Sequence, residues 1–156
     1  MYSKFKPTPS KDLLKQAKNK KFGIVSSEWN PKIIDRLLDG VFVFFKTIEI
    51  EREDIIHFKV PGSFELIYGC SNMKKNFDLD AIIAVGSIIK GETMHFEFIS
   101  QSVCNGIKDL NLTPTCPIIL CLLTDDNIQQ SIERSGGKFG NKGFDCAEAA
   151  AKMSLI

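Results

Sequence analysis

Three short segments hold most of the side chains that suit binding or catalysis. Each follows an apolar run of strand length and precedes residues with helical spacing: Ser26–Asn30, Pro61–Glu65 and Lys90–His95. In open parallel sheets, ligands bind at the carboxyl ends of the strands, beside the amino ends of the following helices. We therefore predict that these segments meet at one edge of a sheet and form a binding site there.

Two of these segments carry an aromatic side chain. Trp29 is the only tryptophan of the chain, and Phe64 follows the next predicted strand. Two such rings on neighbouring loops can hold a flat heteroaromatic ring between their faces, but both could equally be core residues. Glu65 either complements the dipole of the helix that it begins or accepts hydrogen bonds from a bound ligand.

The third segment combines groups that could bind an anion with a histidine that could act as a base. Lys90–Thr93 joins a strand to a helix, so backbone amides, a hydroxyl and a glycine converge there, although many such loops bind nothing. His95 is expected one turn into the helix, where the dipole disfavours imidazolium and keeps a neutral base available. Glu92 and Glu97 oppose that effect. We interpret His95 as a candidate general acid or base.

A fourth cationic segment lies further along the chain. Arg134 ends a predicted helix just before the Gly136–Gly143 loop, which holds Lys138 and Lys142. A rigid guanidinium at this place suits a phosphate clamp, and it also suits the negative end of the helix dipole. The glycine and lysine spacing does not match a P-loop.

The elements that position these residues alternate between strands and helices. Apolar runs predict strands at Phe22–Ser27, Ile55–Val60, Ala81–Ile89 and Pro117–Thr124. Helical spacing follows each run, at Pro31–Phe45, Ser63–Lys75, Phe96–Leu110, a short helix ending near Arg134, and Phe144–Leu155. Asn30 is expected to cap the first of these helices. The pattern predicts an α/β fold, a three-layer α/β/α sandwich around a four-stranded parallel sheet with right-handed crossovers. His57, inside the second strand, is interpreted as structural.

Length and charge limit the domain organisation and the partners. The 156 residues fit one domain, which we place at 22–156, after a basic arm at 1–21 that holds seven lysines. That arm is either simply solvated or a contact for phosphate or RNA. The net charge is +1, so nothing draws the whole protein to nucleic acid or to a membrane surface. No apolar run reaches transmembrane length, and no signal peptide is expected.

The five cysteines form no paired motif, and the chain has only two histidines. Neither a disulfide framework nor a metal site is expected, and no cofactor is indicated. Cysteines within apolar runs indicate a reducing, cytoplasmic compartment.

Four motifs in register resemble the lumazine synthase family of riboflavin biosynthesis. They are Ser26–Asn30 (SSEWN), Pro61–Glu65 (PGSFE), Gly91–His95 (GETMH) and Glu133–Gly143 (ERSGGKFGNKG), and the resemblance runs from about Phe22 to Met153. It implies a flavodoxin-like fold. It also implies condensation of 5-amino-6-ribitylaminouracil with 3,4-dihydroxy-2-butanone 4-phosphate, giving 6,7-dimethyl-8-ribityllumazine, phosphate and water, without metal or cofactor.

The same resemblance implies roles for particular residues. His95 would transfer protons, and Trp29 would stack on the pyrimidine. The other implied substrate contacts are Ser63, Phe64 and Glu65 at the pyrimidine and ribityl chain, Ile88 and Ile89 through their backbone, and Glu92, Thr93, Arg134, Lys138 and Lys142 around the phosphate. The chain departs from the family's usual residues at Leu120 (commonly Phe), Ser63 (Ala) and Met94 (Pro or Thr).

The resemblance further implies assembly. Family members form pentamers or icosahedral 60-mers with the active site shared between adjacent subunits, and riboflavin synthase is a candidate partner. The main alternative is a non-catalytic lumazine- or riboflavin-binding or cage-forming protein on the same fold. A flavodoxin-type electron carrier is disfavoured because the segment after the first strand is too bulky for a phosphate-binding loop. A receiver domain is disfavoured because Lys90-Gly91 stands where such a domain needs an Asp.

Overall fold

The structure is a computed structural model that describes residues 11–156, so Lys4 and Lys6 of the predicted arm lie outside the described residues. Its centre is one parallel sheet with the strand order β2-β1-β3-β4. The strands are β1 (Phe22–Ser27), β2 (Ile56–Val60), β3 (Ala81–Ile89) and β4 (Ile118–Asp125). The predicted four-stranded parallel sheet is confirmed.

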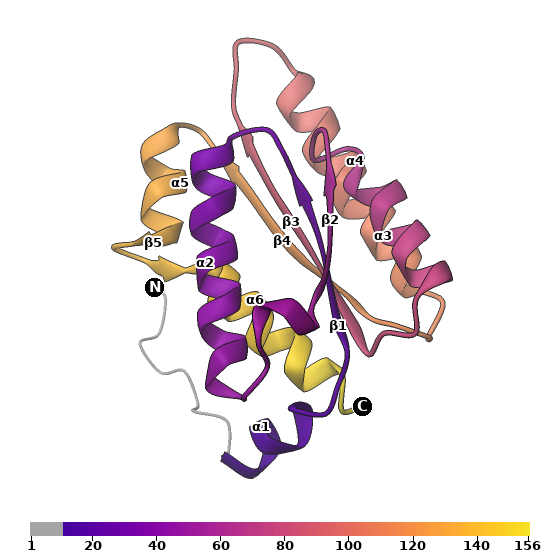
Figure 1. The fold of residues 1–156 in the computed structure, drawn as a ribbon. Coiled ribbons are helices and arrows are strands. Elements are labelled where there is room, and N and C mark those ends of the chain that lie inside the picture. Colours follow the sequence, from indigo (N-terminus) through magenta and orange to yellow (C-terminus); the bar gives the residue numbers. More distant parts are fainter. Residues whose placement is uncertain (1–10) are drawn as a thin grey trace.

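Helices cover both faces of this sheet (Figure 1). One face packs against α2 (Pro31–Thr47) and α6 (Lys142–Met153), and the other against α3 (Leu66–Asn76) and α4 (His95–Asn111). A short α5 (Ile128–Arg134) follows β4, and a single 3₁₀ turn, η1 (Arg52–Asp54), precedes β2. The three-layer, flavodoxin-like sandwich predicted from the sequence is confirmed. No helix in 11–156 is both long and apolar enough to span a bilayer.

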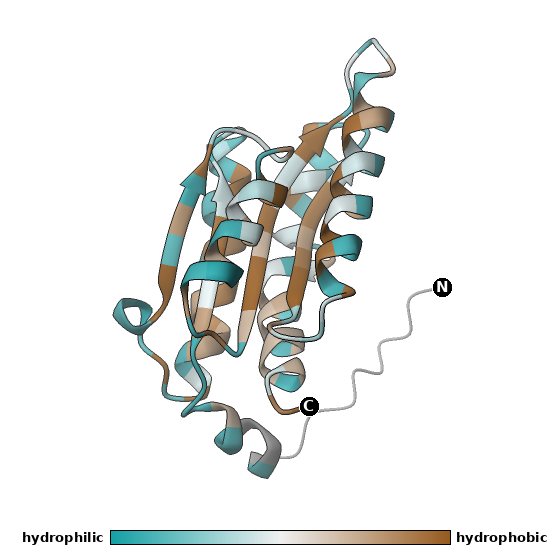
Figure 2. Cartoon of the chain, turned by 90° about the vertical axis from the view of Figure 1, so that its right-hand side faces the viewer, coloured by the Kyte–Doolittle hydropathy of each residue, from teal (hydrophilic) through white to brown (hydrophobic). Residues whose placement is uncertain are grey.

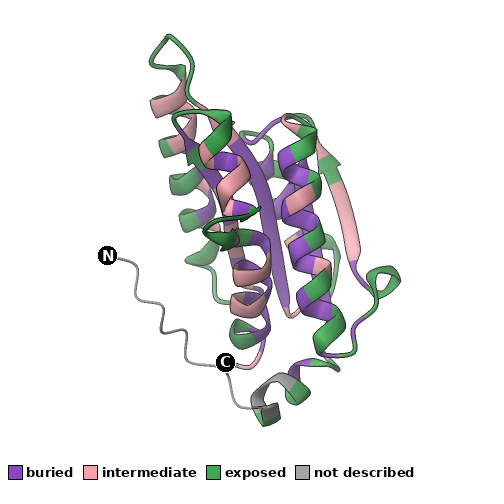
Figure 3. Ribbon diagram, turned by 90° about the vertical axis from the view of Figure 1, so that its left-hand side faces the viewer, coloured by how far each residue is buried: buried purple, intermediate pink, exposed green. Residues whose placement is uncertain are grey.

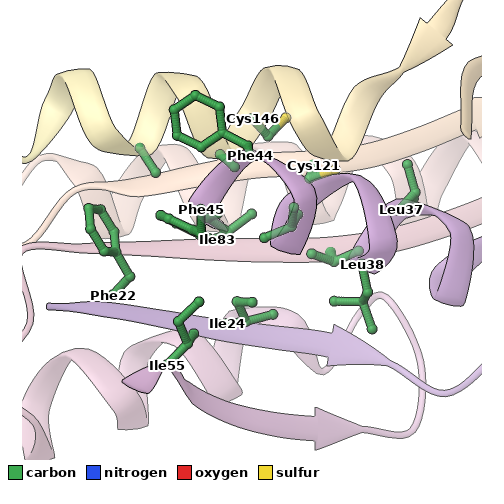
Figure 4. Packing of buried hydrophobic residues seen from close by; sticks show 14 of the residues in the cluster. Phe22, Ile24, Leu37, Leu38, Phe44, Phe45, Ile55, Ile83, Cys121 and Cys146 are labelled. Atoms are coloured by element: carbon green, nitrogen blue, oxygen red, sulfur yellow. The ribbon is translucent and has the colours of Figure 1, made fainter. Parts of the chain in front are cut away.

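The core consists of two apolar layers, one on each side of the sheet. The apolar residues that recur at helical spacing in α2, from Ile33 to Phe45, are buried, and the ring centroids of Phe22 and Phe45 lie 4.7 Å apart (Figure 4). The strands at the centre are the hydrophobic and buried part of the molecule, while the outer faces of the helices are exposed (Figures 2 and 3). Removal of this apolar surface from water is the main force that holds the layers together.

Two local details differ from the sequence-based predictions. The helix after β2 begins at Leu66 instead of Ser63, because the Glu65 carboxylate accepts a hydrogen bond from the Gly62 amide and stabilises a turn before it. The predicted Gly136–Gly143 loop contains a hairpin of β5 (Ser135–Gly137) and β6 (Gly140–Asn141). Gly136 and Gly140 adopt φ values of 114° and 81°, which glycine tolerates best.

Part of the predicted N-terminal arm is helical. Residues Lys11–Ala17 form α1, and Ala17 is buried in the same apolar layer as α2 and α6. Most residues of this segment are good helix formers, and the buried contact of Ala17 anchors its end.

Candidate active site

The three predicted segments meet at the carboxyl edge of the sheet, at the top of Figure 1. The amide of Glu28 donates to the carbonyl oxygen of Val60 at 2.8 Å, and the amide of Trp29 donates to that of Pro61 at 3.2 Å. The side-chain amide of Asn30 donates to the Ser87 carbonyl oxygen at 2.9 Å. The segment after β1 is therefore bonded to the ends of both neighbouring strands.

Asn30 reaches Ser87 because it does not cap α2 with its side chain. Its φ of 57° places it in the left-handed region, which asparagine tolerates better than most residues. The prediction of an Asn30 side-chain cap was wrong, since its amide contacts β3 instead.

Both candidate stacking residues lie at the surface. Trp29 is 68% exposed and Phe64 is 49% exposed, which excludes the interpretation that they are core residues. The Trp29 ring lies close to the backbone of Gly62, where an added Cβ would be 3.6 Å from Trp29 Cε3. Two largely exposed aromatic side chains are thus presented on adjacent loops.

The turn between β2 and α3 fixes the candidate ligand contacts beside these rings. Glu65 Oε2 accepts from the Gly62 amide at 2.9 Å, so this bond orients an exposed carboxylate. Ser63 is buried against β3, where a Cβ at Gly86 would lie only 2.7 Å from Ser63 Oγ. Glycine at position 86 therefore permits the close approach of the Ser63 side chain to the sheet.

Glu92 and Thr93 of the loop between β3 and α4 are exposed to solvent, and so is His95 after it. His95 is the first residue of α4, so the expectation that it lies one turn inside the helix was wrong. Its amide donates to Thr93 Oγ1 at 3.4 Å, and the N-cap residue Met94 makes no side-chain cap. The amides of a helix's first turn favour an anion beside them.

An ion pair partly neutralises one acidic side chain near His95. Lys90 Nζ lies 3.2 Å from Glu97 Oε1. The pKa of Glu97 is lowered, first by a hydrogen bond from its own backbone amide and then by Lys90. Glu97 is therefore held as an anion that Lys90 partly compensates.

The β3 and β4 residues with predicted roles occupy different levels of the sheet. Ile88 and Ile89 are the last residues of β3 and are half-buried beside the candidate site. Leu120 lies in the middle of the edge strand β4, opposite Ala84, and packs against the layer of α3 and α4. Within one chain, Leu120 is therefore not among the residues gathered at the strand ends.

Arg134 is held at the end of α5 by three groups. Its Nε lies 3.8 Å from Asp125 Oδ1, its Nη1 donates to the Gln130 carbonyl oxygen at 3.3 Å, and its guanidinium carbon lies 5.2 Å from the centre of the Phe139 ring. Lys138 Nζ lies 5.3 Å from the same ring. Lys142 begins α6 and pairs with Asp145 at 3.8 Å.

The structure does not bring Arg134 and His95 together within one chain. Ile132 of α5 packs on the apolar layer of α2 and α6, whereas Val103 of α4 belongs to the layer on the other face. Figure 1 shows α5 and its hairpin on the opposite side of the sheet from α4. One chain therefore presents two half-sites, one aromatic with a histidine and one cationic.

The structure agrees with the structural interpretation of His57. Ser26 Oγ and His57 Nε2 are 2.8 Å apart on neighbouring strands. The pKa of His57 is lowered, first by burial and then by the charges of Lys59 and Arg52. No cluster of three potential metal ligands occurs within the described part of the chain.

Comparisons with known proteins point to one family. Residues 19–156 match the model of the 6,7-dimethyl-8-ribityllumazine synthase family. The chain belongs to this family of enzymes. A 6,7-dimethyl-8-ribityllumazine synthase of Christiangramia forsetii is 52% identical over 94% of the chain and 88% of its own length. The enzymes of that name from Flavobacterium johnsoniae and Bacteroides fragilis are 49% and 47% identical, over 94% and 85% of the chain and 77% and 93% of their own lengths. The family resemblance inferred from the four motifs is confirmed, and the lumazine synthase family accounts for nearly the whole domain.

Proposed function

We propose that the chain condenses 5-amino-6-ribitylaminouracil with 3,4-dihydroxy-2-butanone 4-phosphate at a site shared by two subunits. Membership of the lumazine synthase family supports the reaction. The observation that carries the shared site is the separation of two incomplete half-sites in one chain, with His95 on one side of the sheet and Arg134 on the other.

The aromatic half-site suits the pyrimidine substrate. Trp29 is exposed and able to stack on a flat ring, and Phe64 adds a second apolar surface. Ser63 and Glu65 offer oxygen atoms to the ring and ribityl donors, and Ile88 and Ile89 offer backbone groups at the end of β3. These contacts bind and orient the amine that attacks the butanone carbonyl.

The remaining groups suit proton transfer and phosphate release. After the amine adds to the carbonyl, loss of water, elimination of phosphate and ring closure each move protons, and His95 is the exposed base beside the ring site. Glu92 and Thr93 lie on the phosphate side of the same loop. Arg134 of the adjacent subunit, with Lys138 and Lys142, stabilises the leaving dianion, and Leu120 of that subunit closes the ring pocket.

Assembly would complete the site. A ring of five subunits repeats one heterologous interface and joins each aromatic half-site to the next chain's cationic half-site. Exposed apolar side chains on the α3 and α4 side, namely Tyr68 at 76% and Phe98 at 62% exposure, are the kind of surface that an interface covers. Twelve such rings would form an icosahedral shell. We place the enzyme in the cytoplasm, where riboflavin synthase would use its product.

The decisive experiment mixes the two substrates with the purified chain and follows lumazine formation by absorbance and phosphate release. Turnover that survives a chelator supports the proposal, including the expectation that no metal takes part. Ligand binding without turnover would favour the alternative of a non-catalytic lumazine-binding or cage-forming protein.

A further inference from the structure

A buried carboxylate lies behind the candidate phosphate ligand. Asp125 is the last residue of β4 and only 4% exposed, although it stands beside the exposed Asp126. A charged side chain is rarely buried unless it is paired and hydrogen-bonded. Its partners therefore indicate what it does.

The side-chain partners of Asp125 both belong to α5. Oδ2 accepts a hydrogen bond from the hydroxyl of Ser131 at 2.8 Å, and Ser131 is itself fully buried. Oδ1 lies 3.8 Å from Nε of Arg134, too far for a hydrogen bond but close enough for an ion pair. Ser131 thus fixes the carboxylate on the Nε side of the guanidinium.

The other contacts of Arg134 leave one side of its guanidinium exposed. Nη1 donates to the Gln130 carbonyl oxygen, and the ring of Phe139 covers one face. No hydrogen bond from Nη2 to a described residue of 11–156 is formed, and the side chain is 42% exposed. The guanidinium is therefore held through Nε and Nη1 while the side chain stays partly exposed, so an anion has access to it.

We propose that Asp125 is a positioning residue that orients Arg134 for the phosphate of the butanone substrate and acts only through Arg134. This inference rests on the proposed role of Arg134 as the phosphate ligand. The fixed orientation lowers the entropic cost of forming the Arg134 bond to phosphate. The main-chain oxygen of Asp125 also accepts a hydrogen bond from the amide of Lys90 at 2.9 Å. This bond links the end of β4, which leads to Arg134, to the end of β3, which leads to His95.

Asp125→Asn tests this role, with Asp126→Asn as its matched control. Both substitutions remove one negative charge at adjacent positions, but only Asp125 contacts Arg134. We expect Asp125→Asn to raise KM for the butanone phosphate about fivefold and to weaken inhibition by inorganic phosphate to the same extent. KM for the pyrimidine should not change, and Asp126→Asn should resemble the unsubstituted enzyme in all these constants.

A double-mutant cycle shows whether the effect passes through Arg134. In an Arg134→Ala background, Asp125→Asn should have no further effect on KM for the butanone phosphate. An unchanged KM in the single variant would overturn the proposal. A lowered KM would also overturn it, because the carboxylate would then be competing with phosphate for Arg134.

Ser131→Ala provides a second test if Asp125→Asn fails to fold. It keeps the charge of Asp125 and removes only the hydroxyl that holds it, so KM for the butanone phosphate should rise by a smaller factor, and again only when Arg134 is present. An unchanged KM for the butanone phosphate in a folded Ser131→Ala variant would contradict the positioning role. Lack of turnover in the unsubstituted enzyme would instead contradict the proposed function itself.

Discussion

The side-chain amide of Asn30 donates a hydrogen bond to the main-chain oxygen of Ser87 at 2.9 Å and so ties the loop after β1 to β3. The two residues are 57 positions apart in the chain, and their contact holds the loop that carries Trp29 against the strand that ends in Ile88 and Ile89. The candidate ring site is therefore built across two adjacent strands and depends on the register between them.

Trp29 should report on ligand binding. It is the only tryptophan and is 68% exposed, so a heterocycle stacked on it should quench its fluorescence saturably. A fluorescence titration with a ribityl-pyrimidine analogue measures this. Trp29→Phe keeps a ring for stacking and should retain turnover while losing the signal. An unchanged spectrum at analogue concentrations that inhibit turnover would remove Trp29 from the site.

Gly86→Ala should destabilise the fold and disturb Ser63. The new Cβ would meet Ser63 Oγ at 2.7 Å, Leu122 Cδ1 at 2.8 Å and Leu66 Cδ1 at 2.9 Å. Overpacking of this kind lowers the free energy of unfolding by about 1–3 kcal/mol.

Urea denaturation measures this effect, and Gly91→Ala is the control because nothing lies within 4 Å of its added Cβ. KM for the pyrimidine should also rise in Gly86→Ala. Equal stability of the two variants would show that Ser63 does not need this close approach.

His57 should make stability depend on pH. Its pKa in the folded state is below the usual 6.5, so the unfolded chain takes up the proton first as the pH falls. The stabilisation that comes from a neutral His57 is complete above pH 6.5 and decreases as the pH falls below that value. Unfolding temperatures on the two sides of pH 6.5 measure the loss. The unfolding temperature of His57→Gln should differ less between the two pH values than that of the unsubstituted protein. If the two proteins show the same difference, the pH dependence comes from other groups.

Much of this structure could be predicted from local patterns. The strand Ala81–Ile89 is a nearly continuous apolar run, and the stripe from Ile33 to Phe45 has helical spacing, so both elements were predicted close to their observed bounds. The exposure of Trp29 and Phe64 was not predictable, because aromatic side chains occur both in cores and at binding sites.

Contacts between distant residues were the part that local patterns missed. Asparagine is a common residue at helix N-caps, yet the side-chain amide of Asn30 donates to the main chain of Ser87 in β3. Asp125 and Asp126 look alike in the sequence, and only the packing of α5 buries the first against Ser131 and Arg134. The hairpin at Gly136–Gly143 could have been suspected from its glycines, since positive φ values are common in tight turns.

The central claim is that one active site takes His95 from one chain and Arg134 from the next. Arg134→Ala should cost at least about tenfold in butanone-phosphate binding or turnover, because a hydrogen bond to a charged phosphate is lost. His95→Ala should slow turnover about 100-fold by removing the base. Both variants should still assemble, which light scattering checks.

The most direct measurement is the activity of rings reassembled from equal amounts of the two unfolded variants. With random mixing, about a quarter of the interfaces join an intact His95 to an intact Arg134. Activity should therefore rise well above that of either parent, toward that fraction of the unsubstituted enzyme. Verified mixed rings that stay at the mean activity of the two parents would contradict the shared site and the roles given to both residues.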